Sequence, residues 1–190
     1  MIITENIRPQ LWIIAGVNGA GKTTFTNKYL RGKIAIINPD EIAIQKNITP
    51  LQAGKKAILE RQNYLEKKIS FAVETTLSGF NEIELIKKCK DLNYKINLVY
   101  IYLQNKILSY SRVQQRVQNY GHNIPINDIN RRYQKSINNF IKITPIIDRI
   151  YLLDNSDTKT KLVSSFYEGN IKFISKNISP KLKEILSNIN

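Results

Sequence analysis

The sequence predicts an α/β fold, in which a mostly parallel β-sheet of about five strands lies between two layers of helices. Short apolar runs rich in β-branched residues alternate along the chain with helical segments of about ten residues or more. The apolar runs are continuous, which is typical of strands buried on both faces of a parallel sheet. Because no repeat or Gly/Ser-rich linker divides the chain, one domain is expected over residues 1–190, with a core at about 11–156 and a peripheral tail at about 157–190.

Five apolar runs are the expected strands. The first, Leu11-Trp12-Ile13-Ile14-Ala15, ends directly at a glycine, and the second ends at Asn38-Pro39, where the proline cannot donate to a sheet ladder. In parallel sheets of this kind, ligands bind at the carboxyl ends of the strands. The residues that follow each run are therefore candidates for function. The expected strands cover residues 11–15, 34–37, 71–76, 96–103 and 148–153.

Helices are expected between and after these strands. Thr49-Pro50 is a typical helix start. Apolar residues follow it at near-helical spacing with charges between them, and they are Leu51, Ile58, Leu65 and Ile69. This pattern predicts an amphipathic helix. The expected helices cover residues 23–30, 49–68, 83–92, 107–119 and 128–141, with a further helix starting near Glu41 and a short one after Ser179-Pro180 in the tail.

The composition excludes a disordered chain and a membrane-spanning one. The hydrophobic fraction of 42% and the charged fraction of 23% are those of an ordinary globular protein. All apolar runs are far shorter than the roughly 18 to 20 residues that a membrane-spanning helix needs. The N-terminus also lacks the basic and apolar segments of a secretory signal. We therefore expect a cytoplasmic protein without a membrane partner.

The strongly basic balance of the chain has two explanations. A formal net charge of +14 and a pI near 9.8 are compatible with binding to nucleic acid, since Lys and Arg neutralise phosphates. Lys, Asn and Ile are, however, spread over the whole chain without blocks of like charge, as an AT-rich coding bias would produce. The compositional explanation is favoured, a basic site for a phosphorylated ligand comes next, and nucleic acid is not the favoured partner.

The cysteine and histidine counts restrict the metal chemistry. Cys89 is the single cysteine and His122 the single histidine, so neither an internal disulfide nor a Cys/His zinc site is available. Any metal ion must be a hard cation held by oxygen. His122 is interpreted as a structural residue, because no nucleophile lies near it in the sequence.

The segment Gly16-Val17-Asn18-Gly19-Ala20-Gly21-Lys22-Thr23 matches the Walker A pattern of a glycine, four free positions and Gly-Lys-Thr. It lies where the pattern requires it, between a strand and a helix. Glycines let the backbone bring its amides onto phosphate groups, and the helix N-terminus favours negative charge. The sequence therefore predicts a P-loop NTPase of the three-layer αβα type that binds ATP.

The last residues of this segment carry specific expectations. Lys22 is expected to reach the β- and γ-phosphates and to act in catalysis. The Thr23 hydroxyl is the expected ligand of a Mg²⁺ ion that bridges phosphate oxygens. Thr24 completes the expected nucleotide-binding segment at the start of the helix.

Two groups of polar residues lie at the ends of the second and third expected strands. Asp40 or Glu41 is a candidate base for an attacking hydroxyl, whereas the alternative is that Asp40 caps the helix that starts near Glu41. Glu74, Thr75 and Thr76 are candidates for binding an acceptor, and the alternative is a simple polar strand exit. The spacing alone leaves both alternatives open.

Four arginines lie on two expected helices joined by the turn at residues 120–125, and they are Arg112, Arg116, Arg131 and Arg132. Glycine and proline punctuate this turn, so the two helices are a candidate lid. Guanidinium groups suit phosphate oxygens, and one or two of them can stabilise charge on a transferred phosphoryl group. The alternative for each arginine is a solvated helix face. Arg116 is the first choice on its helix, and either Arg131 or Arg132 is expected to face the nucleotide.

Several stretches together resemble the zeta-toxin-like P-loop kinases, small bacterial ATPases that include the UDP-N-acetylglucosamine kinases of toxin–antitoxin modules. The resemblance runs from about Leu11 to Ser156. It is carried by residues 15–24, 37–43, 70–79, 116–117 and 120–125, by Arg131-Arg132-Tyr133 with Ser136 and Asn139, and by Asp154-Asn155-Ser156.

The resemblance implies roles for several of these residues. Asp40 would be the general base for the acceptor hydroxyl, Glu74 with Thr75 or Thr76 would contact the acceptor, and the lid arginines would hold the phosphates. It also implies a nucleotide-sugar acceptor and an antitoxin protein as a partner. Tyr120 departs from the family pattern, in which a second glycine commonly precedes the Gly-His pair, and the chain is shorter than the best-known toxins of the family.

The identity of the acceptor therefore stays open between two classes of molecule. A third interpretation of the protein involves no acceptor. The first is a small metabolite, with a nucleotide-sugar such as UDP-N-acetylglucosamine preferred. The second is a polynucleotide or tRNA, motivated by the basic charge. The third reading is a non-catalytic switch that orders its lid on ATP and signals to a partner.

Overall fold

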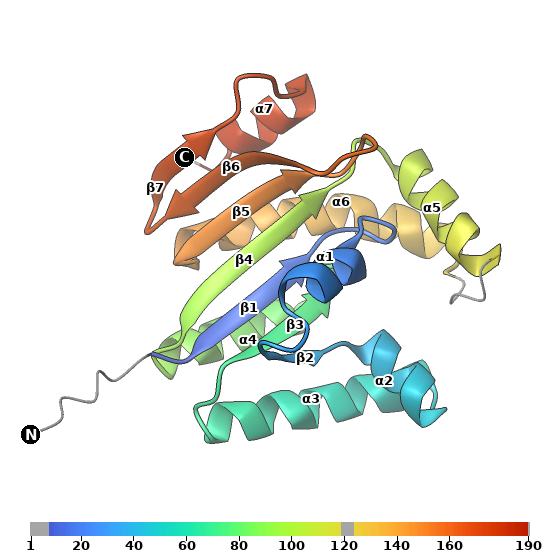
Figure 1. Ribbon diagram of the computed structural model, residues 1–190, viewed down its shortest axis with the longest axis vertical. Helices are drawn as coiled ribbons and strands as arrows, with labels where there is room; N and C mark the ends of the chain where they lie inside the picture. The colour runs from blue at the N-terminus through green and yellow to red at the C-terminus, as the bar shows by residue number, and fades with distance from the viewer. Residues whose placement is uncertain (1–7, 119–123, 190) are drawn as a thin grey trace, which may run out of the picture.

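The computed structural model describes residues 8–118 and 124–189, and its centre is a seven-stranded sheet in the order β2-β3-β1-β4-β5-β6-β7 (Figure 1). The strands are β1 (Gln10–Ala15), β2 (Ala35–Ile37), β3 (Phe71–Thr75), β4 (Lys95–Tyr102), β5 (Arg149–Asp154), β6 (Lys161–Tyr167) and β7 (Asn170–Ile174). The first five in chain order run parallel, whereas β6 and β7 pair antiparallel to their neighbours. The predicted α/β fold with about five parallel strands is confirmed.

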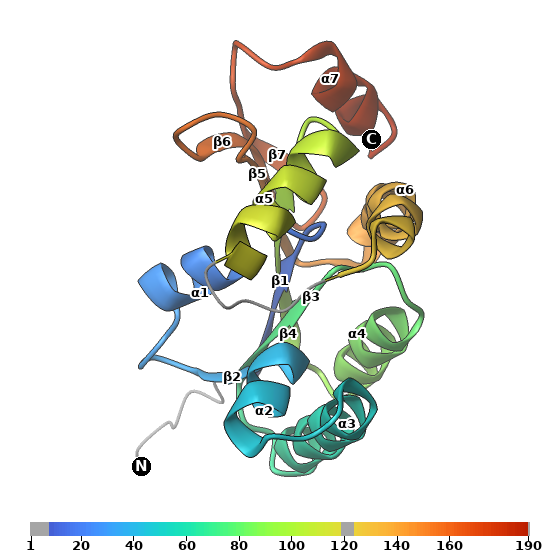
Figure 2. The same ribbon diagram turned by 90° about the vertical axis from the view of Figure 1, so that its right-hand side faces the viewer.

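Helices cover both faces of this sheet, as Figure 2 shows with the sheet seen nearly edge-on. They are α1 (Lys22–Tyr29), α2 (Pro39–Lys46), α3 (Pro50–Glu66), α4 (Asn81–Asp91), α5 (Lys106–Gln118), α6 (Ile126–Ile143), the short 3₁₀ helix η1 (Thr144–Ile146) and α7 (Pro180–Ser187). Helices α3, α4, α6 and α7 pack on one face, and α1 and α5 pack on the other. Within the described residues, no helix has the length and apolarity to span a bilayer.

Strand β1 lies at the centre of the sheet and contributes to both apolar layers. Leu11 and Ile13 belong to the larger core cluster, while Ile14 belongs to the smaller cluster on the opposite face. This placement explains why the run is apolar at every position. Because β1 lies between β3 and β4, the loop that follows it emerges at the middle of the sheet, within reach of both neighbours.

Helix α3 forms as predicted, but it turns a different face to the core than its large apolar residues suggest. Ala53, Ala57 and Leu65 are buried, whereas Leu51 is 72% exposed and Ile58 is 49% exposed. Small alanine side chains allow a close approach to neighbouring elements, and that approach selects the buried face. The apolar spacing therefore identified the helix but not its orientation.

The tail at about 157–190 contains two strands, β6 and β7, that the sequence does not predict. The sequence predicts only one helix in this part of the chain. β6 pairs with β5, and β7 pairs with β6 at the edge of the sheet. Val163 and Phe166 of β6 are buried together with Leu182 and Ile185 of α7. The signal for β6 is weak in the sequence because serines interrupt its apolar residues, and every residue of β7 is exposed.

Cys89 is expected to resist thiol reagents as long as the chain is folded. Its side chain is fully buried in α4, and burial raises the pKa of the thiol to about 12. Because the thiolate is the reactive species, such a shift lowers the labelling rate on the order of a thousandfold near neutral pH. Labelling rates in buffer and in concentrated urea measure this difference, and rapid labelling of the folded protein would contradict it.

Candidate active site

The predicted P-loop connects β1 to α1 and is shaped by close contacts with its neighbours. Gly16 has a φ of 147°, and a Cβ atom there would lie 2.4 Å from the carbonyl oxygen of Ile101 in β4. Gly21 precedes α1 with a left-handed φ of 93°, and its missing Cβ makes room for the amide of Asn155. Glycine is therefore required at both positions by the geometry.

Side chains from distant parts of the chain hold the carbonyl groups of this loop. The Ser109 hydroxyl of α5 donates to the Asn18 carbonyl at 2.6 Å, and the Asn155 amide after β5 donates to the Ala20 carbonyl at 2.9 Å. Over the described residues, the amides of Gly19, Gly21, Lys22 and Thr23 have no hydrogen-bond acceptor. A cluster of free amides at a helix N-terminus fits a phosphate group.

The charged residues that the sequence predicts for the site act on the ammonium group of Lys22. Its ammonium donates to the carbonyl oxygens of two loop residues at 2.9 and 3.0 Å, and burial lowers its pKa to about 8. Glu74 and Asp40 act on this pKa in the opposite direction, and Arg116 and Arg132 lower it further. All four charges therefore lie within electrostatic range of the lysine, although they come from four different elements.

Glu74 lies at the P-loop threonine, deep in the protein. The Thr23 hydroxyl donates to its Oε2 atom at 2.9 Å, and the Asn38 amide donates to the same atom at 3.1 Å. Its Oε1 atom is buried and has no hydrogen-bond partner within the described chain. Burial raises the pKa of the carboxyl, and the Thr26 and Thr23 hydroxyls act against that rise. The sequence did not single out Asn38 as a site residue.

These oxygen atoms fit a hard divalent cation. A threonine hydroxyl and a buried carboxylate at 2.9 Å from each other are the ligand types that Mg²⁺ prefers, with water and phosphate oxygens as the remaining ligands. The described residues contain no group of three or more His, Cys, Asp or Glu side chains that would form a complete protein cage. Thr23 and Glu74 are therefore the candidates for holding the ion.

Asp40 does not cap helix α2. The N-cap is Asn38, whose Oδ1 atom accepts from the Asp40 amide at 3.0 Å, and the helix begins at Pro39. The capping alternative for the Asp40 carboxylate is therefore wrong. Within the described residues this exposed carboxylate has no hydrogen bond or ion pair, so it is available to a ligand.

The loop after β3 presents hydroxyl groups beside this carboxylate-rich region. The Thr75 hydroxyl accepts from the amide of Leu77 at 2.9 Å, while Thr76 and Ser78 share a hydrogen bond of 2.8 Å between their hydroxyls. Leu77 is buried with a left-handed φ of 56°, and the Asn139 amide of α6 donates to its carbonyl at 2.9 Å. Thr75 thus has a structural role in the loop, which leaves Thr76 and Ser78 as the hydroxyls for an acceptor.

The neighbouring arginines of α6 have different surroundings. Arg131 donates to Asp128 at 2.8 Å on the surface. Arg132 lies 3.6 Å from Asp128 and its charge lowers the pKa of Lys22, so Arg132 is the candidate for facing the loop. The lid turn at residues 119–123, which includes Tyr120 and His122, lies outside the described residues.

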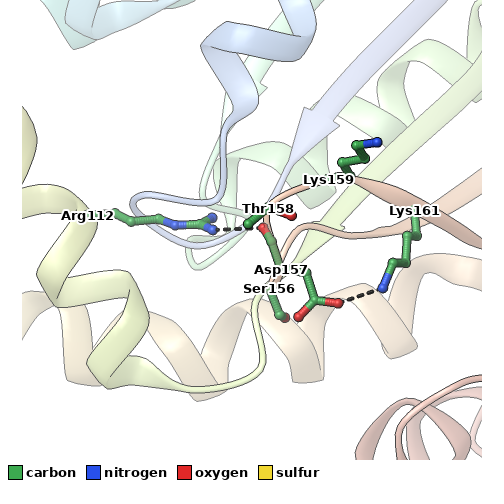
Figure 3. A pocket seen from close by; sticks show the side chains of 6 residues that line it. All are labelled: Arg112, Ser156, Asp157, Thr158, Lys159 and Lys161. Carbon is green, nitrogen blue, oxygen red and sulfur yellow. Dashed lines mark hydrogen bonds and ion pairs between the residues drawn. The ribbon is translucent and has the colours of Figure 1, made fainter.

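A pocket of about 560 Å³ lies beside the P-loop and was not predicted (Figure 3). Arg112 reaches from α5 toward the segment after β5, where it lies 3.5 Å from the Asp157 carbonyl oxygen. The Cβ atom of Arg112 is also 3.1 Å from the position of a Cβ atom on Gly19. The remaining lining residues are Ser156, Asp157, Thr158, Lys159 and Lys161.

Comparison with solved structures agrees with this architecture. The structure resembles the AvrRxo1-ORF1:ORF2 complex with ATP at a TM-score of 0.69 and 17% identity, covering 97% of this chain and 64% of that chain. It also resembles the PezAT toxin–antitoxin system of Streptococcus pneumoniae at a TM-score of 0.66 and 19% identity, covering 96% and 84%. The chain thus spans less than two thirds of the AvrRxo1 chain. At these identities the likeness concerns the fold alone.

The mostly parallel sheet and its glycine-rich loop before a helix define an α/β protein with the P-loop fold. The chain belongs to the zeta toxin family, whose model matches residues 53–165, more than half of its length. It is also 30% identical over 139 residues to an uncharacterized protein of Haemophilus influenzae, covering 67% of this chain and 99% of that protein. The predicted family is confirmed. The matched residues begin after the P-loop and Asp40, which therefore rest on their own pattern and geometry.

Proposed function

We propose that the protein is an ATP-dependent kinase that transfers the γ-phosphoryl group to a hydroxyl of a small metabolite. A nucleotide-sugar such as UDP-N-acetylglucosamine is the first candidate for the acceptor. The observation that carries the proposal is the gathering of Asp40, Glu74, Arg116 and Arg132 around Lys22. Phosphoryl transfer requires mainly positioning and charge neutralisation, and this set of charges on a P-loop supplies both.

The donor nucleotide is assigned to the P-loop and the adjoining pocket. The free amides of Gly19, Gly21, Lys22 and Thr23 bind phosphate oxygens, and the pocket beside Arg112 has room for the nucleoside. The solved AvrRxo1 complex contains ATP, which supports the same ligand for this fold. We also propose the cytoplasm as the site of the reaction, because ATP is its proposed donor.

Thr23 and Glu74 are assigned to Mg²⁺. Their oxygens lie 2.9 Å apart, and the unpartnered Oε1 atom of Glu74 can accept from a water molecule of the ion. Mg²⁺, when bound, neutralises charge on the β- and γ-phosphate oxygens. Glu74 is thereby assigned to the metal ion at the phosphates, whereas the sequence analysis expected it to contact the acceptor. Thr76 and Ser78 remain as the residues that contact the acceptor.

Asp40 is assigned the role of general base. Its carboxylate accepts the proton of the acceptor hydroxyl while the acceptor oxygen bonds to the γ-phosphorus, and the bond from that phosphorus to the bridging β–γ oxygen breaks, so that ADP leaves. Lys22, Arg116 and Arg132 stabilise the charge on the transferred group. Glu41, the neighbouring carboxylate, is paired with Arg31 at 2.7 Å and is not available for this role.

An antitoxin protein is the proposed macromolecular partner. The two solved structures compared above each involve a second protein. One is described as a toxin–antitoxin system and the other as a complex of ORF1 with ORF2. The net charge of +14 favours an acidic protein as the partner of this chain.

A transfer assay tests the proposed function. The protein is incubated with [γ-³²P]ATP and Mg²⁺ together with nucleotide-sugars, nucleosides or RNA, and the Lys22→Met variant gives the background. Labelled nucleotide-sugar supports the proposal. Label in RNA that disappears with added salt would replace the small metabolite by a polynucleotide, and phosphate release without any labelled product would overturn the kinase assignment in favour of a nucleotide-dependent switch.

A further inference from the structure

Arg61 of α3 is a buried arginine without a satisfactory partner. The residue is only 7% exposed, and its Nε atom is buried without any acceptor in the described chain. Its one ion pair among the described residues, from Nη1 to the Glu82 Oε1 atom, is long at 3.8 Å. Buried guanidinium groups are normally hydrogen-bonded, because desolvation of an unpaired charge is costly. The arrangement therefore indicates a missing anionic partner.

The guanidinium of Arg61 lies beside the loop that carries the proposed acceptor hydroxyls. Glu82 stands in the first turn of α4, and its Oε2 atom is 3.5 Å from the position of a Cβ atom on Gly79. A row of contacts thus leads from Arg61 in α3, through Glu82, to Gly79 in the loop after β3. Glu82 is the charge that acts on Arg61, whereas the charges around Lys22 are Glu74, Asp40, Arg116 and Arg132.

The N-terminus of α4 presents further donors at the same place. Its N-cap is Phe80, which offers no side-chain hydrogen bond. Within the described chain, the amides of Asn81, Glu82 and Ile83 have no acceptor, and the first helical bond is donated by the amide of Glu84. Free amides at a helix start attract oxyanions, and the buried arginine adds a full positive charge to them.

Two glycines reduce the side-chain bulk near this group. Gly54 lies seven residues before Arg61, which places the two only about 20° apart around the axis of α3. A Cβ atom on Gly54 would meet nothing within 4 Å, and one on Gly79 would meet only the Glu82 carboxylate. Neither glycine therefore adds a side chain to this side of α3 or to the loop after β3.

We propose that Arg61 and the N-terminus of α4 bind a phosphate-type oxyanion carried by the acceptor. The inference rests on the proposed kinase function, and it adds that the acceptor is an anion held at a second site, away from the P-loop. A planar guanidinium matches the oxygens of such a group in a bidentate manner. A neutral nucleoside or sugar would leave the arginine unpaired and would be a poor acceptor.

A binding experiment tests the subsite without knowledge of the acceptor. The P-loop is first saturated with the Mg²⁺ complex of a non-hydrolysable ATP analogue, and inorganic phosphate is then titrated calorimetrically. The wild type is expected to bind phosphate, with affinity at least about tenfold lower in Arg61→Met because one charged bidentate contact is lost. Arg149→Met, which removes the same charge at the far end of β5, is the matched control and is expected to bind phosphate normally.

Two further variants separate binding from folding. Arg61→Met/Glu82→Gln removes both charges, so it leaves no unpaired buried carboxylate, and it is expected to lose phosphate binding as well. Glu82→Gln alone keeps Arg61 and removes a competing anion, so phosphate is expected to bind several-fold more tightly. Unchanged phosphate binding in the Arg61 variants, or an equal loss in Arg149→Met, would overturn the subsite.

The transfer assay distinguishes a failure of the subsite from a failure of the kinase assignment. If Arg61→Met transfers label to a neutral acceptor as efficiently as the wild type does, the subsite is wrong and the kinase remains. If no acceptor is labelled but phosphate binding still depends on Arg61, the kinase assignment is wrong and the oxyanion site remains.

Discussion

The Asp40→Asn variant is expected to transfer phosphate on the order of 10²- to 10⁴-fold more slowly than the wild type, which is the usual contribution of a positioned base. Asparagine keeps the size of the side chain but cannot take up the acceptor proton. The fold is not expected to change, because Asn38 caps α2 and the Asp40 carboxylate has no partner in the described chain. Single-turnover transfer with the labelled acceptor measures the effect.

The affinity for ATP decides how a slow Asp40→Asn variant is interpreted. The nucleotide is expected to bind as in the wild type or more tightly, since a negative charge near Lys22 is removed. Glu41→Gln is the matched control, because its carboxylate belongs to a surface ion pair with Arg31 and surface pairs contribute little. Transfer at the wild-type rate in Asp40→Asn, or an equal loss in Glu41→Gln, would show that another group is the base.

The Arg132→Ala variant is expected to lose on the order of 10²- to 10³-fold in kcat/KM, whereas Arg131→Ala stays close to the wild type. The two residues are adjacent on α6, and both lie near Asp128. Arg132 lowers the pKa of Lys22, whereas Arg131 is hydrogen-bonded to Asp128 on the surface, so Arg132 is the better placed of the two to stabilise the transferred group. Steady-state kinetics at several ATP concentrations measures both values.

Thermal unfolding of the two arginine variants controls for stability. Each variant removes one cation near the same exposed aspartate, so the expected losses in stability are small and similar. A large kinetic effect that is confined to Arg132 therefore reports on the reaction. Equal kinetic losses in both variants, or a larger loss in Arg131→Ala, would contradict the orientation of α6 over the loop.

The elements that the sequence predicts correctly are those with a strong local pattern. Residues 11–15 form an apolar run that must be buried on both faces, and the Walker A pattern directly after it requires a turn before a helix. In α3 the local pattern is ambiguous, because both Leu51 and Ala53 belong to plausible helical stripes. Packing against the neighbouring elements buries the alanine and exposes the leucine.

The candidate site could be predicted only in part. Asp40 and Lys22 follow strand ends and Glu74 is the penultimate residue of β3, and parallel strands bring their ends to one edge of the sheet. The polar residues that hold the loop carry no comparable signal. Ser109 contacts Asn18 across 91 positions of sequence, and Asn155 contacts Ala20 across 135.

The sequence by itself determined the P-loop, the order of strands and helices from β1 to β5, and the family to which the chain belongs, because each depends on residues that are close together in the chain. The tertiary structure alone decided that the charge of Arg132 acts on Lys22, that Glu74 bonds to Thr23, and that Arg61 is buried without a hydrogen bond among the described residues. Each of these depends on the direction of a side chain between elements, which packing sets and local spacing does not.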